Sequence, residues 1–116
     1  MKHNESILQR ECVKWFRYQY PQFKKNFFAV GNGGARSKAE AAIMNGEGVT
    51  AGVSDLLLLV PRNGFHGMAI EMKHGKNTLS THQQTFKAAV EKHGYKHITC
   101  WTFYEFHREI IMYLNN

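Results

Sequence analysis

The chain has 116 residues, of which 43% are hydrophobic, and a formal net charge of +6 at pH 7. This length allows one hydrophobic core and this composition argues against disorder, so we expect a single domain over residues 1–116. No apolar run reaches membrane-spanning length and the N-terminus lacks the apolar centre of a signal peptide, so we expect a cytoplasmic protein without a membrane partner. The positive charge favours a polyanionic partner, although many soluble proteins are equally basic without one.

Residues 5–20 predict an amphipathic helix, with Asn4 as its N-cap and Pro21 directly after its end. Glu5 and Gln9 are four residues apart and therefore lie on one face of this helix. The apolar stripe of the helix consists of Leu8, Cys12, Trp15 and Phe16.

The spacing of cysteines and histidines gives no sign of a zinc site. Neither Cys-x-x-Cys nor His-Glu-x-x-His occurs among the two cysteines and seven histidines. Cys12 and Cys100 lie in apolar surroundings, so we expect two buried free thiols in a reducing compartment.

Residues 26–30 predict the first strand, and the glycine-rich residues 31–34 open the loop that follows it. No Gly-Lys-Ser or Gly-Lys-Thr follows at the spacing of a nucleotide-binding loop, so we expect no nucleotide cofactor. A short helix is predicted from Ser37 to Asn45, because Ser37 and Glu40 form a capping box and Gly46 can end the helix.

Two neighbouring strands are predicted over residues 55–60 and 66–73, joined by turn-forming residues. The first is a continuous apolar run after one acid, as expected of a strand that is buried on both faces. Side chains alternate along the second, so Glu71 and Lys73 share one face. Two small residues on that face, Gly67 and Ala69, leave room above the sheet. The side chains that point the other way, into a core, are Met68, Ile70 and Met72.

The register between these strands decides whether Asp55 joins Glu71. A two-residue turn at Asn63-Gly64 would pair Asp55 with Met72 and put the two acids on opposite faces. A three-residue loop over residues 62–64, with Gly64 left-handed, pairs Asp55 directly with Glu71. We predict the second register, because an acid beside a leucine-rich strand is costly to bury without a partner.

This register would bring two carboxylates and an ammonium group together. Opposed residues have α-carbons about 4.5–5.5 Å apart, and two carboxylates at that spacing can share one magnesium ion with bonds to oxygen of about 2.0–2.1 Å. Such a group suits the binding of a divalent cation against a phosphodiester and the activation of a water molecule. In the alternative interpretation, Asp55 only caps a turn, and Glu71 and Lys73 decorate an exposed strand.

The last third of the chain predicts a helix from Ser80 to about His93, a strand over residues 97–101 and a helix over residues 103–114. Gln83 follows Ser80 by three residues and completes a capping box. The apolar residues of the closing helix exceed what one helical face needs, which indicates core packing first and a dimer surface second.

In their order and spacing, these motifs resemble the VRR-NUC domains of the PD-(D/E)xK nuclease superfamily. The matching segments are Glu5-x-x-x-Gln9, Tyr20-Pro21, Asn32-Gly33-Gly34 with Arg36, Gly48-Val49-x-Ala51-Gly52-Val53-x-Asp55, Glu71-x-Lys73, Leu79-Ser80-x-x-Gln83 and Gly94-Tyr95. One departure is Ser54, because the family usually has proline before the aspartate. The resemblance implies a restriction-endonuclease-like α/β fold, with a mixed four-stranded sheet flanked by helices in the order α-β-α-β-β-α-β-α.

The resemblance also implies roles for individual residues. Asp55 and Glu71 would hold one or two Mg²⁺ or Mn²⁺ ions, with the backbone carbonyl of Met72. The acid from the first helix would be Glu5, with Glu11 as the competing candidate, although Glu5 is also simply favoured at a helix N-terminus. The catalytic set would be completed by Lys73, which orients the nucleophile or stabilises charge, and by Gln83, which contacts water or phosphate. Apart from the resemblance, the placement of basic and polar residues in or beside loops near the predicted site leads us to expect phosphate contacts from Asn32, Arg36, Lys38, Arg62 and Lys76.

The activity implied by the resemblance is structure-selective cleavage of branched DNA, including four-way (Holliday) junctions, in a bacterial cell or a phage-infected host. Two symmetric cuts need two sites, so we expect a homodimer. Two alternatives stay open. The protein could be a flap-directed or end-directed nuclease within a larger repair or phage replication complex, or a non-catalytic nucleic-acid-binding module. The intact Asp, Glu and Lys set argues against the second.

Overall fold

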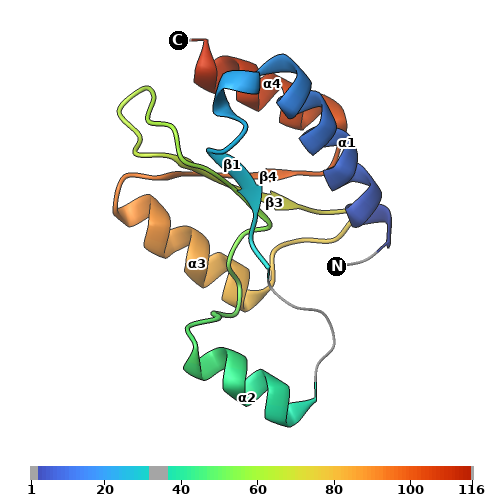
Figure 1. The fold of residues 1–116 in the computed structure, drawn as a ribbon, viewed down its shortest axis with the longest axis vertical. Coiled ribbons are helices and arrows are strands. Elements are labelled where there is room, and N and C mark those ends of the chain that lie inside the picture. The colour runs from blue at the N-terminus through green and yellow to red at the C-terminus, as the bar shows by residue number, and fades with distance from the viewer. Residues whose placement is uncertain (1–2, 32–36, 116) are drawn as a thin grey trace.

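The computed structural model of the protein describes residues 3–31 and 37–115 (Figure 1). The helices and strands follow the predicted order, with one additional 3₁₀ helix, η1. They are α1 (His3–Gln19), η1 (Pro21–Phe23), β1 (Phe27–Ala29), α2 (Lys38–Gly46), β2 (Leu56–Leu58), β3 (Met68–Met72), α3 (Thr81–Lys92), β4 (Lys96–Cys100) and α4 (Phe103–Leu114). None of these described helices is both long enough and apolar enough to span a lipid bilayer.

The four strands form one mixed sheet in the order β1-β2-β3-β4. β2 is antiparallel to both β1 and β3, and β3 is parallel to β4. The parallel pair needs a crossover, which α3 supplies. In Figure 1, α1 and α4 lie together on one side of the sheet and α3 lies on the other. The predicted α/β fold with a four-stranded mixed sheet is therefore confirmed.

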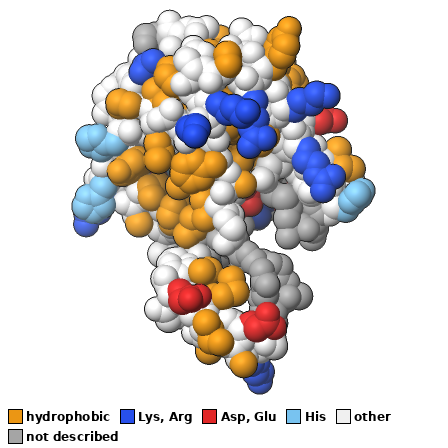
Figure 2. Space-filling model, viewed as in Figure 1, with side chains coloured by type: hydrophobic (Ala, Val, Ile, Leu, Met, Phe, Trp, Pro, Cys, Tyr) orange, Lys and Arg blue, Asp and Glu red, His pale blue; other side chains and the backbone are white. Residues whose placement is uncertain are grey.

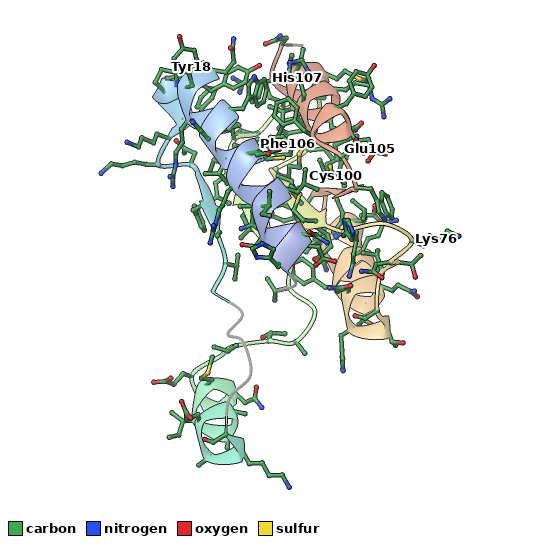
Figure 3. The ribbon with its side chains drawn as sticks, turned by 90° about the vertical axis from the view of Figure 1, so that its right-hand side faces the viewer. Tyr18, Lys76, Cys100, Glu105, Phe106 and His107 are labelled. Carbon is green, nitrogen blue, oxygen red and sulfur yellow. The ribbon has the colours of Figure 1, made fainter. Side chains whose placement is uncertain are left out.

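The hydrophobic core lies between the sheet and the pair of helices α1 and α4. Strand alternation supplies one half of it, because every second side chain of β2 and β3 faces these helices. Those side chains are Leu56, Leu58, Met68, Ile70 and Met72, each at most 2% exposed. The helices supply the other half, with Cys12, Phe16, Phe106 and Ile110 fully buried. Figure 3 shows Phe106 and Cys100 in this layer, and both cysteines are buried free thiols.

The prediction that residues 55–60 are buried on both faces is wrong. Leu57 is only half-buried and Leu59 is 50% exposed. The reason is the position of α3, which packs against β4 at the far side of the sheet and leaves the second face of β2 partly open. The predicted room above Gly67 is also filled, because the Tyr95 ring lies 3.6 Å from where a Cβ at Gly67 would be.

The hairpin between β2 and β3 reaches the predicted register by an unpredicted route. Leu56 pairs with Ile70 and Leu58 with Met68, so the same register places Asp55 opposite Glu71. The predicted three-residue loop is nevertheless wrong, because Asn63 and Gly64 (φ 54° and 84°) form a two-residue turn.

The turn is closed by reciprocal hydrogen bonds between Arg62 and Phe65. Between this bridge and the regular ladder, residues 59–61 face the two residues 66–67, and the extra residue restores the register. The bulged stretch includes Pro61, which has no backbone N–H to donate to a partner strand.

The helix termini largely follow the sequence signals. Ser37 and Ser80 cap α2 and α3 in complete capping boxes, as predicted. Asn4 lies inside α1 rather than capping it, and its Nδ2 lies 3.3 Å from His74 Nε2. α4 has the predicted bounds and packs Phe106, Ile110, Tyr113 and Leu114 into the core. Two further apolar residues of this helix, Tyr104 and Met112, are exposed, so core packing accounts for only part of its apolar excess.

α2 stands apart from the rest of the molecule. None of its residues is buried, and Ile43 is 62% exposed. Figure 1 shows α2 below the sheet, beyond the N-terminal end of β2. The segment from Glu47 to Ser54 leads from α2 back to the strand that begins after Asp55.

Candidate active site

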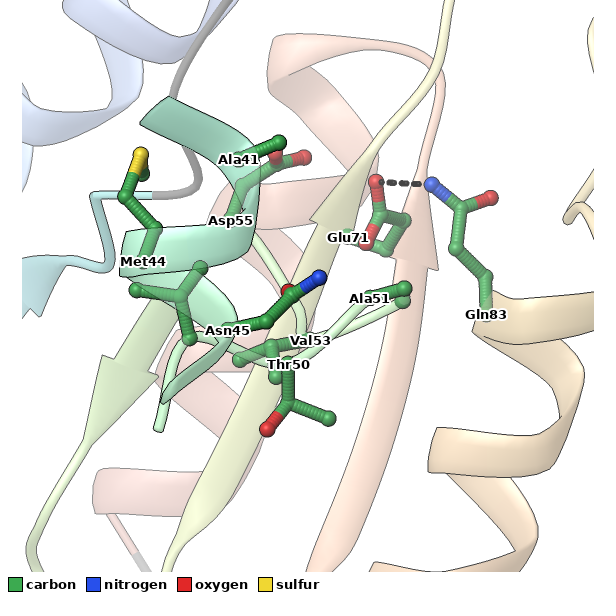
Figure 4. A pocket seen from close by; sticks show the side chains of 11 residues that line it. Ala41, Met44, Asn45, Thr50, Ala51, Val53, Asp55, Glu71 and Gln83 are labelled. Atoms are coloured by element: carbon green, nitrogen blue, oxygen red, sulfur yellow. Dashed lines mark hydrogen bonds between the residues drawn. The ribbon is translucent and has the colours of Figure 1, made fainter. Parts of the chain in front are cut away.

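The predicted acids meet at one end of the sheet. Asp55 directly precedes β2, and its Oδ2 accepts a hydrogen bond of 2.7 Å from the backbone N–H of Met72. Glu71 lies on β3 opposite it and is only 3% exposed. Figure 4 shows both carboxyl groups at the same pocket. The register of the hairpin therefore creates a carboxylate pair.

Gln83 joins this pair from the first turn of α3. Its Nε2 donates to Glu71 Oε2 at 3.1 Å, drawn as the dashed line in Figure 4. Its Oε1 accepts a 2.8 Å hydrogen bond from the backbone N–H of Ser80. The two interpretations of this residue are thus compatible, since the capping box holds the amide in the orientation that presents its nitrogen to Glu71.

Burial raises the pKa of Glu71 to about 9. The charge of Asp55 and a hydrogen bond with its carboxyl group also raise this pKa, whereas the positive charge of Lys73 lowers it. Oε1 of Glu71 is buried, and no donor from the described residues reaches it. Burial and the neighbouring carboxylate therefore favour the protonated form of the side chain, which a bound cation would reverse.

The helix-1 acid near this pair is Glu5 rather than Glu11. Glu5 is 9% exposed, and its charge contributes to the raised pKa of Glu71. Its Oε2 accepts a hydrogen bond of 3.3 Å from Asn77 Nδ2. Glu11 is exposed and lines a separate apolar hollow beside Trp15. No sequence motif had indicated Asn77, which lies in the irregular segment between β3 and α3.

Lys73 follows β3 immediately and is half-buried. Its backbone N–H donates to the carbonyl of Cys100 at 2.9 Å, which extends the pairing of β3 with β4 by one residue. Lys73 is two residues after Glu71 and so lies on the same face of the sheet, and its positive charge lowers the pKa of Glu71. The structure therefore brings Asp55 and Glu71 together, with Lys73 next along the same face of the sheet.

A pocket of about 340 Å³ opens beside the carboxylates. Its walls are α2, the segment over residues 49–53, and the side chains of Asp55, Glu71 and Gln83. Gly52 (φ 85°) fixes the segment against α3, because a Cβ there would overlap the backbone carbonyl of His82. Ser54 is fully buried, and its hydroxyl has no hydrogen-bond partner in the described part of the chain.

The donor set fits a hard divalent cation held by two carboxylates. Within residues 3–31 and 37–115, no group of three or more His, Cys, Asp or Glu side chains is placed to hold a metal ion. Magnesium commonly needs only one or two protein carboxylates, because it keeps several of its waters. The pair of Asp55 and Glu71 satisfies this condition, and the unpartnered Oε1 of Glu71 supplies a free ligand atom.

The residues predicted to bind DNA are more dispersed. Asn32 and Arg36 lie outside the described residues. Lys38 is exposed at the start of α2, and Lys76 is exposed in the segment before α3, where Figure 3 shows it extending outwards.

Arg62 lies at the opposite end of the hairpin from the acids, seven residues or roughly 23 Å of extended chain from Asp55. Its guanidinium is 5.6 Å from the centre of the Phe23 ring, and its Nη1 donates to the carbonyl of Pro61 at 2.8 Å. The structure therefore does not bring Arg62 to the carboxylate pair.

Two acids and a lysine at one end of a mixed four-stranded sheet are the arrangement of PD-(D/E)xK nucleases. The family model described as "VRR-NUC domain" matches residues 3–102, so the chain belongs to the VRR-NUC domain family. A solved structure titled "VRR_NUC domain protein" has 22% sequence identity and a TM-score of 0.84, covering 99% of this chain and 91% of that one. No curated protein matches the chain. The family is of the nuclease type, which implies DNA as the substrate.

Proposed function

We propose that the protein is a metal-dependent, structure-selective DNA endonuclease that hydrolyses phosphodiester bonds in branched DNA. The observation that carries this proposal is the pairing of Asp55 with Glu71, a carboxyl group that is only 3% exposed and whose Oε1 is reached by no donor from the described residues. A buried acid that faces a second carboxylate is costly to keep ionised, and a divalent cation is the ligand that would offset this cost.

Asp55 and Glu71 are the residues that would hold Mg²⁺ or Mn²⁺, together with the carbonyl of Met72 and with Glu5 close by. When bound, the metal lowers the pKa of a water ligand and offsets negative charge on the phosphate. The chain's own groups prepare this site: the Met72 N–H orients Asp55, and Gln83 orients Glu71. Lys73 provides a compact positive charge for the attacking oxygen or the phosphate.

The preference for branched DNA is supported by the position of α2. This helix has no buried residue and projects beside the pocket that contains the carboxylates. A DNA substrate that reaches the acids therefore meets a projecting helix, which suits recognition of shape. Paired cuts in a four-way junction would require two such sites, so the proposal includes a two-fold homodimer.

The test is cleavage of labelled four-way junction, 5′-flap and linear duplex DNA by purified protein, with Mg²⁺, Mn²⁺ or EDTA. We expect metal-dependent cleavage of the junction by the wild-type protein and by Lys92→Gln, which removes an exposed charge at the end of α3. Asp55→Ala and Lys73→Ala should abolish it.

Cleavage that survives both active-site substitutions would refute the site. Preference for the flap would point to an end-directed repair nuclease. Binding without cleavage under every metal condition would point to a non-catalytic module. Sedimentation of a single chain, both free and on the junction, would remove the homodimer from the proposal.

A further inference from the structure

A second hollow lies away from the carboxylates, between α1 and the edge strand β1. Its volume is about 500 Å³, and it is bounded on the strand side by Ala29. Three cations line it from α1, Arg10, Lys14 and Arg17. They recur at intervals of four and three residues and therefore project from one face of the helix. This hollow contains none of the residues that we predicted from the sequence to bind DNA.

Glu11 lies near Lys14, since both line the neighbouring hollow beside Trp15, but the α1 hollow itself contains no acid. None of its lining residues is acidic, and Arg10, Lys14 and Arg17 form no ion pair with any residue in the described ranges. The residues outside those ranges include no Asp or Glu. Like charges three and four residues apart destabilise a helix. A solvated helix face tolerates such a cost, but three cations that converge on one hollow without an acid are typical of an anion-binding surface.

The α1 hollow begins next to the carboxylate site. Gln9, one turn after Glu5, lines it, and the Oε1 of Gln9 is buried without a partner among the described residues. Its amide can present either an acceptor or a donor to a ligand after rotation. From Glu5 the helix rises roughly 18 Å to Arg17. Figure 2 shows Lys and Arg side chains gathered over the upper part of this face, where α1 and β1 lie in Figure 1.

We infer that the α1 hollow binds the sugar–phosphate backbone of the DNA arm next to the scissile phosphate. This inference rests on the proposed nuclease function, which supplies the DNA. Arg10 and Arg17 are separated by about 10 Å along the helix axis, which corresponds to about three nucleotides of one strand at 3.4 Å each. Arginine forms paired hydrogen bonds with phosphate oxygens, and the small side chain of Ala29 keeps the strand side open.

The test is the salt dependence of DNA binding in EDTA, measured by fluorescence anisotropy with a labelled four-way junction. The variant is Arg10→Gln with Arg17→Gln, and the matched control is Lys92→Gln with Arg108→Gln, which removes the same charge from exposed positions on α3 and α4. Loss of two phosphate contacts should lower the slope of log affinity against log salt by about 1.8. When the salt concentration is lowered from 1 M to 0.1 M, the affinity of the variant should therefore fall about 60-fold relative to that of the wild type.

The control variant should keep the wild-type slope, and both variants should keep the wild-type circular dichroism spectrum. An unchanged slope for Arg10→Gln/Arg17→Gln, or an equal loss in the control, would overturn the α1 hollow as a DNA site. If the α1 hollow is overturned in this way but the wild-type protein cleaves DNA, the proposed nuclease function stands without the α1 hollow. If the wild-type protein never cleaves DNA but the slopes differ as expected, the α1 hollow stands and the nuclease proposal fails.

Discussion

The two ends of the molecule treat buried polar groups in opposite ways. On α4, Tyr113 is 2% exposed, and its hydroxyl donates a hydrogen bond of 2.7 Å to the carbonyl of Val60. At the carboxylate end, Glu71 Oε1 and Ser54 Oγ are buried without partners among the described residues. The first arrangement stabilises the fold, whereas the second lowers stability and leaves polar atoms ready for a ligand. For these three groups, the contrast separates a residue that holds the fold from residues at the site.

The largest expected effect is on catalysis. Asp55→Ala removes one of the two carboxylates and should lower the rate of DNA cleavage by at least about a thousandfold, because the metal would lose a ligand. The melting temperature should fall only modestly, because Asp55 lies outside the core and the main loss is the acceptor of the buried Met72 N–H. Single-turnover cleavage and thermal melting measure the two quantities. A large fall in melting temperature would mean that Asp55 belongs to the fold as well as to the site.

The next largest expected effect is a loss of stability, and it concerns the hydrophobic core under α4. Phe106→Ala empties a fully buried position between α1 and the sheet, and it should destabilise the protein by about 3–5 kcal/mol. The matched control is Tyr104→Ala on the same helix, because Tyr104 is 67% exposed and its loss should cost much less. Urea denaturation compares the two variants. Similar losses in both would show that α4 is not packed as the structure has it.

The same contrast explains what the sequence could predict. The core was predictable because alternation in β3 and helical periodicity in α1 depend only on local spacing. The pairing of Asp55 with Glu71 was predicted correctly, but by the wrong loop, because a bulge at residues 59–61 leaves no clear local signal. The hydrogen bond from Asn77 to Glu5 joins residues 72 positions apart and has no sequence pattern at all. Both failures depend on tertiary contacts.

The third effect is a pH dependence that only the carboxylate end should show. The pKa of Glu71 is raised from 4.5 to about 9, so the folded, metal-free protein keeps a proton that the unfolded chain releases across this range. Stability should therefore fall as the pH rises from about 5 to 9, with a slope of at most about 1.4 kcal/mol per pH unit from this group. Glu71→Gln should flatten this dependence, whereas Glu109→Gln should not.

Metal binding gives the matching measurement. Because a divalent cation replaces the proton on Glu71, Mn²⁺ should bind more tightly as the pH rises towards 9 and should release a proton on binding. Isothermal titration calorimetry in buffers with different ionisation enthalpies reports that proton. A pH-independent affinity with no proton release would show that Glu71 is already ionised in the free protein.

The smallest expected effects are changes in stability when one of two buried hydroxyl groups is removed. Ser54→Ala removes a buried hydroxyl without a described partner and should raise stability by about 1 kcal/mol, because the cost of burying that group disappears. Tyr113→Phe removes a hydroxyl that is hydrogen-bonded and should lower stability by about 1–3 kcal/mol, because the carbonyl of Val60 is left unpaired. Differential scanning calorimetry should show melting temperatures that move in opposite directions. A fall in both melting temperatures would mean that Ser54 has a hydrogen-bond partner of its own, such as an ordered water. The carboxylate end would then be less destabilised than its unpaired atoms indicate.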